Sequence, residues 1–136
     1  MNAKQWLSRA RNIDREIDGL MRTRDETKAR VLSITQSFTG DIVQSTKDPH
    51  KFDRLVELEN EIDQRIEELL LVKKEIESGI SVLHDARYRE VLRMRYLRNM
   101  TFEEIAVGIK YSYKQTCRIH GRALLKMEEV LHGKVS

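Results

Sequence analysis

The sequence is poor in the features that build sheets, disulfides and membrane spans. Proline occurs once and aromatic side chains make up only 6% of the 136 residues, which argues against β-sandwiches and barrels. The single cysteine, Cys117, has no partner for an internal disulfide. No Cys/His cluster has metal-ligand spacing, so we expect no metal and no other cofactor.

Long apolar runs are also lacking. The longest aliphatic run, at residues 69–72, is far too short for a transmembrane helix, and the first residues lack the apolar core of a secretory signal. We therefore expect a cytoplasmic protein with no membrane partner. No nucleophile has a base at a spacing that would support catalysis, so we do not expect an enzyme.

Charge is abundant, because 35% of the residues are Asp, Glu, Lys or Arg. The net charge of +3 is unevenly distributed: +2 over residues 1–48 (nine basic, seven acidic), −5 over 49–86 (five and ten) and +6 over 87–136 (eleven and five). A basic C-terminal segment favours a polyanionic partner.

Residues 1–84 carry two stripes of mostly apolar residues at alternating spacings of three and four. This pattern predicts helices over about 3–38 and 49–83, with Asp48 as the N-cap and Pro49 at the first helical position. One connecting loop predicts an antiparallel hairpin of coiled-coil type, in which Trp6 lies across from Leu83 and His84. The residues expected at the hairpin or oligomer interface are Trp6, Ile13, Ile17, Leu20, Ile62, Ile66, Leu69 and Ile76.

Such a hairpin buries little surface per residue, so we expect it to pack on a second copy, giving a homodimer, or on the C-terminal domain. Its acidic residues are spread around the helix axis and are interpreted as a solvated face rather than a metal site. The hairpin is interpreted first as a structural scaffold, and docking of a partner is the alternative.

Residues 85–136 contain the start and stop signals of three short helices. Asp85 is a candidate N-cap, and Asn99 can stop a helix in the left-handed conformation. Thr101 with Glu104, and Ser112 with Gln115, form two capping boxes whose N-caps are eleven residues apart. They predict a helix at Phe102–Ile109, a corner at 110–111 and a following helix, which is the layout of a helix-turn-helix without a wing.

The last helix has a clear inside and outside. Projection at 100° per residue places Thr116, Ile119, Ala123 and Met127 on the buried side. The opposite, polar face suits the major groove of DNA, where arginine can bind guanine through two hydrogen bonds. Gly121 on this face either permits close approach of a partner or packs against another helix. The outward residues are Tyr113, Lys114, Cys117, Arg118, Gly121 and Arg122.

Residues 88–131 resemble region 4 of bacterial sigma factors. The similarity lies in a Leu/Arg/Tyr-rich first helix, in "TFEEIA" opening the second, in "YS" before the third and in "RIHGRAL" along it. Over nearly its whole length, the chain is similar to small phage or prophage proteins that are grouped with transcriptional activators of late genes.

The resemblance implies that the third helix enters the major groove, with Tyr113, Lys114 and Arg118 as reading residues. Thr101, Ser112 and Gln115 then become helix-end or DNA-backbone contacts. The chain departs from the pattern at Lys110, a corner position where glycine is usual, and at Tyr113, where arginine is usual. We include Lys110 among the expected DNA-binding residues.

These observations together predict a phage-type DNA-binding transcriptional regulator in a bacterial host. Double-stranded DNA is its expected partner, and the hairpin serves dimerisation or docking on RNA polymerase. Two alternatives stay open. One is an adaptor for DNA packaging, similar to a small terminase subunit, and the other is a mimic of region 4 that acts on polymerase without binding DNA.

Overall fold

The protein is all-α in the part of the chain that the computed structural model describes, namely the backbone of residues 1–40 and 50–133 and the side chains of 1–34 and 50–133. This confirms the predicted fold class. The expected caps Asp48 and Pro49 lie outside the described residues. The helices are α1 (Ala3–Ser8), α2 (Ile13–Gly40), α3 (Lys51–Ser81), α4 (Ala86–Leu92), the π-helical turn η1 (Arg93–Leu97), α5 (Phe102–Ile109) and α6 (Tyr113–Leu131).

Contacts divide these residues into two compact units. One comprises residues 15–69, the hairpin unit, and the other comprises residues 1–14 together with 70–136, the C-terminal unit. The domain limits expected from the sequence, 1–84 and 85–136, stay a prediction, because compactness alone does not define a part that folds or acts by itself.

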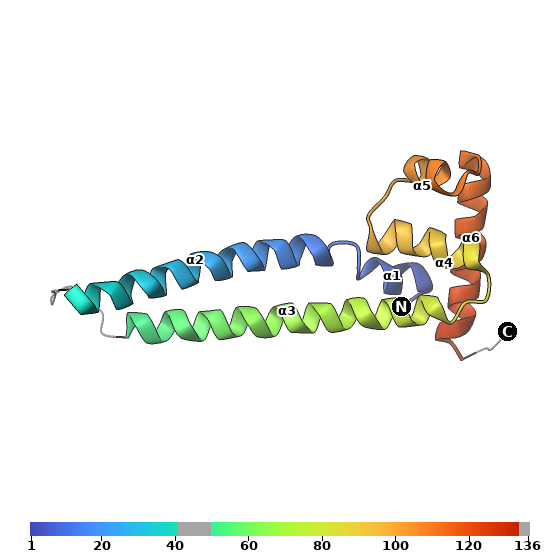
Figure 1. Ribbon diagram of the computed structural model, residues 1–136. Helices are drawn as coiled ribbons and strands as arrows, with labels where there is room; N and C mark the ends of the chain where they lie inside the picture. Colours follow the sequence, from blue (N-terminus) through green and yellow to red (C-terminus); the bar gives the residue numbers. More distant parts are fainter. Residues whose placement is uncertain (41–49, 134–136) are drawn as a thin grey trace. The chain divides into compact units, whose positions relative to one another are not determined.

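In the hairpin unit, α2 and α3 run antiparallel, as predicted (Figure 1). Their apolar stripes face each other, and Ile17, Ile62 and Ile66 are each at most 6% exposed. Leu20 is half-buried beside them. Burial of these side chains removes apolar surface from water, which is the main stabilising contribution available to two paired helices.

Polar residues interrupt both stripes, and each has a partner. Arg24 pairs with Asp63 across the hairpin at 3.1 Å, and Glu59 pairs with Lys28 at 3.7 Å. The buried Thr27 hydroxyl donates to the Thr23 carbonyl oxygen at 2.8 Å. Exposed ion pairs contribute about 0–1 kcal/mol each, so these residues define the pairing of the helices more than they stabilise it.

The expected continuous helix over 3–38 is wrong at its start, because α1 ends at Ser8 and α2 begins at Ile13. Between them, the N–H groups of Ala10, Arg11 and Ile13 donate to the carbonyl three residues earlier, at 3.0–3.2 Å, in place of the α-helical spacing of four. No glycine or proline marks this break in the sequence.

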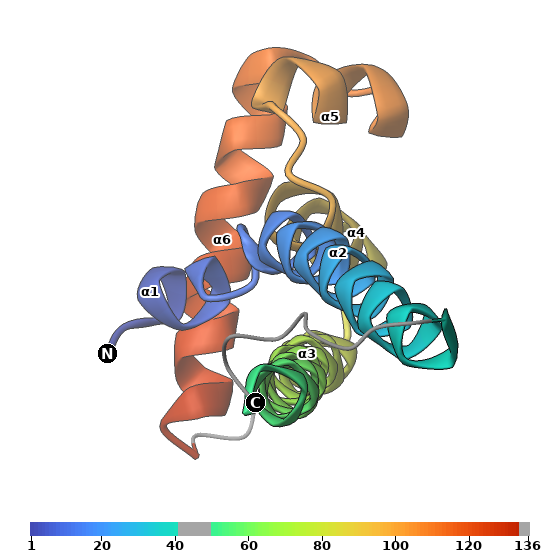
Figure 2. The ribbon, with the colours of Figure 1, turned by 90° about the vertical axis from the view of Figure 1, so that its left-hand side faces the viewer.

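The reason for the break is tertiary: α1 packs within the C-terminal unit, beside α6 (Figure 2). The Ala3 N–H donates to Glu128 Oε2 at 2.7 Å, and Leu7 is completely buried. Trp6 lies against Gly79, where an added Cβ would be 2.6 Å from the indole ring. Trp6 therefore faces α3 about one turn before the expected Leu83 and His84.

The eight residues expected at a hairpin or oligomer interface are all buried or half-buried within the single chain. Ile17, Leu20, Ile62, Ile66 and Leu69 lie in the hairpin unit, and Trp6, Ile13 and Ile76 lie in the C-terminal unit. These side chains are already covered by other residues of the same chain, so a role in dimerisation stays a prediction.

The remaining core of the C-terminal unit joins α4, α5 and α6. Val91, Ile105 and Ile119 are at most 4% exposed and form its centre. The partly buried hydrophobic residues packed against this centre are Tyr88, Met94, Met100, Phe102 and Ile109.

Candidate nucleic-acid interface

The corner between α5 and α6 is built by local hydrogen bonds. The Glu104 N–H donates to Thr101 Oγ1 at 3.2 Å, and the Thr101 N–H donates to Glu104 Oε1 at 2.9 Å, as a capping box requires. The second box is equally complete, with the Gln115 N–H donating to Ser112 Oγ at 3.1 Å. Both predicted boxes are confirmed, and they fix where α5 and α6 begin.

The residues that end the helices adopt the left-handed conformation. Asn99 has φ of 55°, as predicted, and Lys110 has φ of 62° and ψ of 40°. The N–H groups of Lys110 and Tyr111 both donate to the Ala106 carbonyl oxygen, which closes the end of α5. Lys110 thus occupies the usual glycine position without moving the corner, at a conformational cost of about 1–2 kcal/mol.

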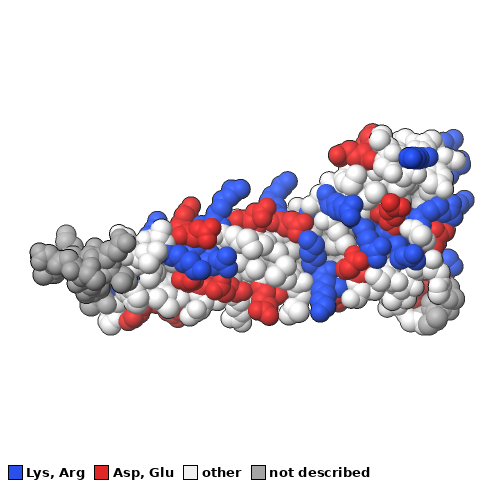
Figure 3. All heavy atoms as spheres, viewed as in Figure 1, with Lys and Arg blue, Asp and Glu red and all other residues white. Residues whose placement is uncertain are grey.

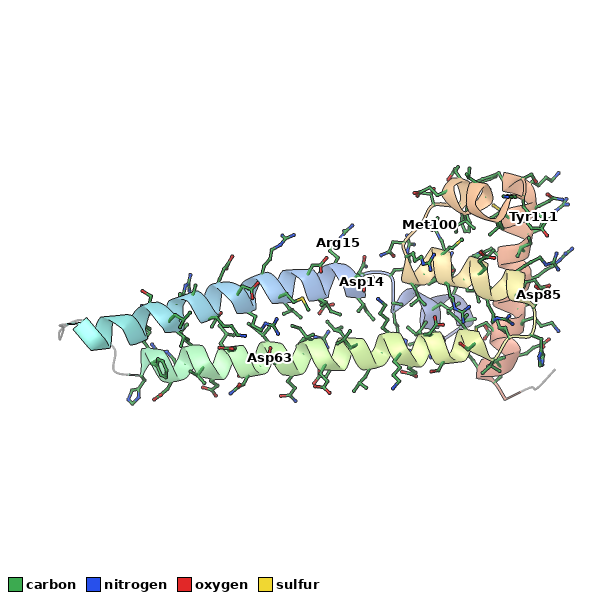
Figure 4. All side chains as sticks on the ribbon, viewed as in Figure 1. Asp14, Arg15, Asp63, Asp85, Met100 and Tyr111 are labelled. Carbon is green, nitrogen blue, oxygen red and sulfur yellow. The ribbon has the colours of Figure 1, made fainter. Side chains whose placement is uncertain are left out.

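The corner presents the N-terminal half of α6. Figure 4 shows Tyr111 at this corner and Met100 before α5. The inner stripe is the predicted one, since Thr116, Ile119, Ala123 and Met127 are each at most 4% exposed. All six predicted outward residues are exposed except Cys117, which is half-buried. The Tyr113 side chain hydrogen-bonds with Cys117, which raises the pKa of Tyr113.

Three basic residues on this face are free for an external partner. Lys114, Arg118 and Arg122 are exposed, and none of them pairs with a carboxylate among the residues that the structure describes. Gly121 lies between them, and an added Cβ would meet no atom within 4 Å. Within the described part of the chain, packing against a helix therefore does not explain Gly121, and close approach of a partner is the interpretation that stays open.

A fourth basic residue, which the sequence did not single out, joins one edge of the face. Arg87 of α4 lines a cavity of about 150 Å³ with Tyr111, Gln115, Arg118 and Arg122. Its guanidinium donates to Asp85 at 3.0 Å, and this pairing lowers the pKa of the Asp85 carboxyl group. Because Arg87 lies on another helix, the periodicity of α6 gave no sign of it.

On the opposite edge, His120 is held by aromatic neighbours. Its Nε2 is 2.8 Å from the Tyr96 hydroxyl, and its ring meets Phe102 edge-on at 4.9 Å. Burial, followed by the charges of Arg95 and Lys4, lowers the pKa of His120 to about 4. The imidazole is therefore neutral at pH 7 and serves packing and hydrogen bonding, as expected.

Basic side chains also gather over α4 and α6 on the face shown in Figure 3. Among the described residues, no three His, Cys, Asp or Glu side chains are grouped so that they could hold a metal ion. Within the same residues, no helix has both the length and the apolar character needed to cross a lipid bilayer.

Comparison with known proteins gives one match. No curated protein and no solved structure matches the chain. Residues 85–129, which run from the cap of α4 almost to the end of α6, match the family "Sigma-70, region 4". Domains of this family are non-catalytic DNA-binding modules, so the match supports a DNA-binding role related to transcription. The C-terminal segment of the chain, residues 85–129, is therefore similar to region 4 of sigma-70 factors.

Proposed function

We propose that the protein is a phage-type regulator of transcription that inserts the N-terminal half of α6 into the major groove of DNA. The observation that carries this proposal is the outward face of α6, on which Lys114, Arg118 and Arg122 are exposed and lack carboxylate partners among the described side chains. Side chains of this kind bind DNA phosphates and base edges.

The residues of this face have different roles in the proposal. Arg118 binds a base edge, because it is exposed beside Gly121, where the helix surface is open and the groove floor can approach closely. Lys114 and Tyr113, at the start of the helix, are the other reading residues. Lys110, which precedes α6, and Arg122, which lies farther along it, bind phosphates.

Thr101, Ser112 and Gln115 contribute indirectly. Their side chains are engaged in the capping boxes, where each accepts a hydrogen bond from a backbone N–H at 3.1–3.3 Å. They therefore hold the helix ends in place, and their exposed positions leave room for contacts with the DNA backbone.

The test uses Arg118→Ala, with Arg22→Ala on the exposed surface of α2 as a control that removes the same charge. Duplexes would first be selected from a random pool with the full chain, and affinities then measured by fluorescence anisotropy. Arg118→Ala should weaken binding to the selected duplex by about 1–3 kcal/mol, whereas the control should not. Unchanged affinity in Arg118→Ala would show that the groove assignment is wrong.

For the hairpin unit we propose dimerisation or docking on RNA polymerase. Met21, Leu32, Phe52 and Leu58 are 37–60% exposed in this unit and offer apolar surface to a second copy or to a partner. Sedimentation equilibrium distinguishes the possibilities by mass. A dimer supports the first role, a monomer that binds polymerase supports the second, and a ring of many copies points instead to the packaging adaptor.

A region 4 mimic that acts on polymerase alone is the remaining alternative. It predicts no duplex binding even at low salt, where electrostatic attraction to phosphates is strongest. The unpaired basic residues on α6 favour the DNA-binding proposal over this one.

A further inference from the structure

A second basic cavity, of about 250 Å³, lies along the opposite edge of α6 from Arg87. Its basic residues come from three separate parts of the chain: Lys4 from α1, Arg11 from the turn that follows α1, and Arg95 from η1. The edge of α6 contributes Cys117 and His120. No acidic residue lines the cavity.

The charges of these three residues act on the same place and are not neutralised locally. Lys4 and Arg11 form no ion pair within the described part of the chain. Arg95 donates one N–H to the Met100 carbonyl oxygen at 3.0 Å and lies 4.3 Å from the centre of the Phe102 ring, which leaves most of its five N–H donors available. His120 also lines the cavity, and its pKa is lowered first by burial and then by the charges of Arg95 and Lys4.

The segment that brings Lys4 and Arg11 here is anchored. The Asn2 side chain accepts from the Gln5 N–H at 2.8 Å, which caps α1, and Glu128 accepts from the Ala3 N–H at 2.7 Å. Leu7 is fully buried in the same helix. The two basic side chains therefore project from a fixed backbone, which reduces the entropy lost when they bind an anion.

The two cavities flank the proposed reading face. At 100° per residue, Arg118 and Arg122 lie at one edge of the outward surface of α6, and Cys117 and His120 lie at the other. The first edge adjoins Arg87 and the second adjoins the new cavity. A helix in the major groove, about 12 Å wide, has a phosphate backbone on each side.

We propose that Lys4, Arg11 and Arg95 bind a backbone phosphate on the side of the groove opposite the edge of α6 that adjoins Arg87. This inference rests on the proposed function. The cavity is smaller than the roughly 300–1,000 Å³ typical of small-molecule sites, and it suits a phosphate group. The N-terminal segment thus acts as a clamp that extends the DNA contacts beyond residues 85–129.

The test compares the full chain with the variant Lys4→Gln/Arg11→Gln, which removes both charges and keeps side chains of similar length. Arg22→Gln/Arg30→Gln, exposed on α2, is the control with the same loss of charge. Affinity for a mixed-sequence duplex of about 20 base pairs, roughly two helical turns, is measured over a range of salt concentrations. Ethylation interference then maps which phosphates are contacted.

The clamp variant should reduce the slope of log affinity against log salt by about 0.9, since one phosphate contact contributes about 0.9. With the clamp variant, ethylation of phosphates on one side of the groove should no longer interfere with binding, whereas interference on the other side should persist. The control variant should change neither the salt slope nor the interference pattern. Each single variant, Lys4→Gln or Arg11→Gln, should reduce the slope by a part of this amount, since the other basic residues still contact the phosphate. If the circular dichroism spectrum of the double variant differs from that of wild type, the salt slopes of the two single variants provide the test instead.

Two negative results have different meanings. If the wild-type chain does not bind the duplex even at low salt, the proposed function fails and the clamp fails with it. If the wild-type chain binds, Arg118→Ala weakens binding to the selected duplex, and the clamp variants keep the wild-type slope and interference pattern, the clamp alone is refuted.

Discussion

Replacing Lys110 by glycine should stabilise the protein while weakening its binding to DNA. Lys110 has φ of 62°, a conformation that costs an L-residue about 1–2 kcal/mol and costs glycine almost nothing. Glycine also adds conformational freedom to the unfolded chain, which offsets about 0.4–1 kcal/mol of this gain. The net increase in the free energy of unfolding should be about 0.5–1 kcal/mol, or about 2–5 °C in Tm.

Lys74→Gly is the matched control, because Lys74 is an exposed residue within α3. There the same substitution should lower stability by roughly 0.7 kcal/mol, because glycine is a poor helix former. Both variants would be followed by circular dichroism during thermal and urea unfolding. If Lys110→Gly lowers Tm as Lys74→Gly does, Lys110 does not have the left-handed conformation, and the account of the corner is refuted.

DNA binding should move in the opposite direction from stability. If Lys110 contacts a phosphate, Lys110→Gly removes one contact and reduces the salt slope by about 0.9. An unchanged slope in a stabilised variant would show that Lys110 has only a conformational role.

Two further predictions concern α6. Gly121→Ala and the control Gly19→Ala on α2 should each stabilise the protein by about 1 kcal/mol, because an added Cβ meets no atom within 4 Å at either position. Only Gly121→Ala should also weaken duplex binding measured by fluorescence anisotropy. If Gly121→Ala binds the duplex as tightly as wild type, close approach of DNA at Gly121 is refuted. The pKa of His120 is lowered from 6.5 to about 4, so below pH 6.5 the unfolded state binds a proton that the folded state does not. The free energy of unfolding, measured by urea unfolding, should therefore fall as the pH drops from 6.5 to 4. His120→Gln should remove this part of the pH dependence. If His120→Gln has the same pH dependence as wild type, the lowered pKa of His120 is wrong.

Local rules were enough to predict the corner of the C-terminal unit. A capping box involves residues three positions apart, and a buried stripe involves the period of one helix, so Thr101, Ser112 and the inner residues of α6 could all be identified from the sequence. Asn99 was predictable for the same reason, since its short side chain tolerates the left-handed conformation.

The features that were missed all depend on contacts between distant parts of the chain. The break between α1 and α2 was missed because Trp6 and Ala10 fit the heptad pattern, which continues through residues 9–12 without interruption. The pattern gives no sign that α1 packs on α6. Whether Trp6 continues a hairpin or fills the space above Gly79 is decided by the fit of the indole ring to that site. Arg87 was missed on the same grounds, because its position beside Tyr111 follows from the packing of α4 on α6.

The N-terminal segment changes how the C-terminal unit should be understood. The match to sigma-70 region 4 covers residues 85–129, yet the α6 helix of that match also holds α1 through Glu128. One end of α6 carries exposed basic residues that have no carboxylate partner among the described side chains. Near the other end, Glu128 accepts a hydrogen bond from the Ala3 N–H, and Leu7 of the same segment is fully buried. A fragment that begins at residue 85 would keep the reading face and lose Lys4, Arg11 and the cover that Leu7 provides. The first fourteen residues therefore belong with the C-terminal unit.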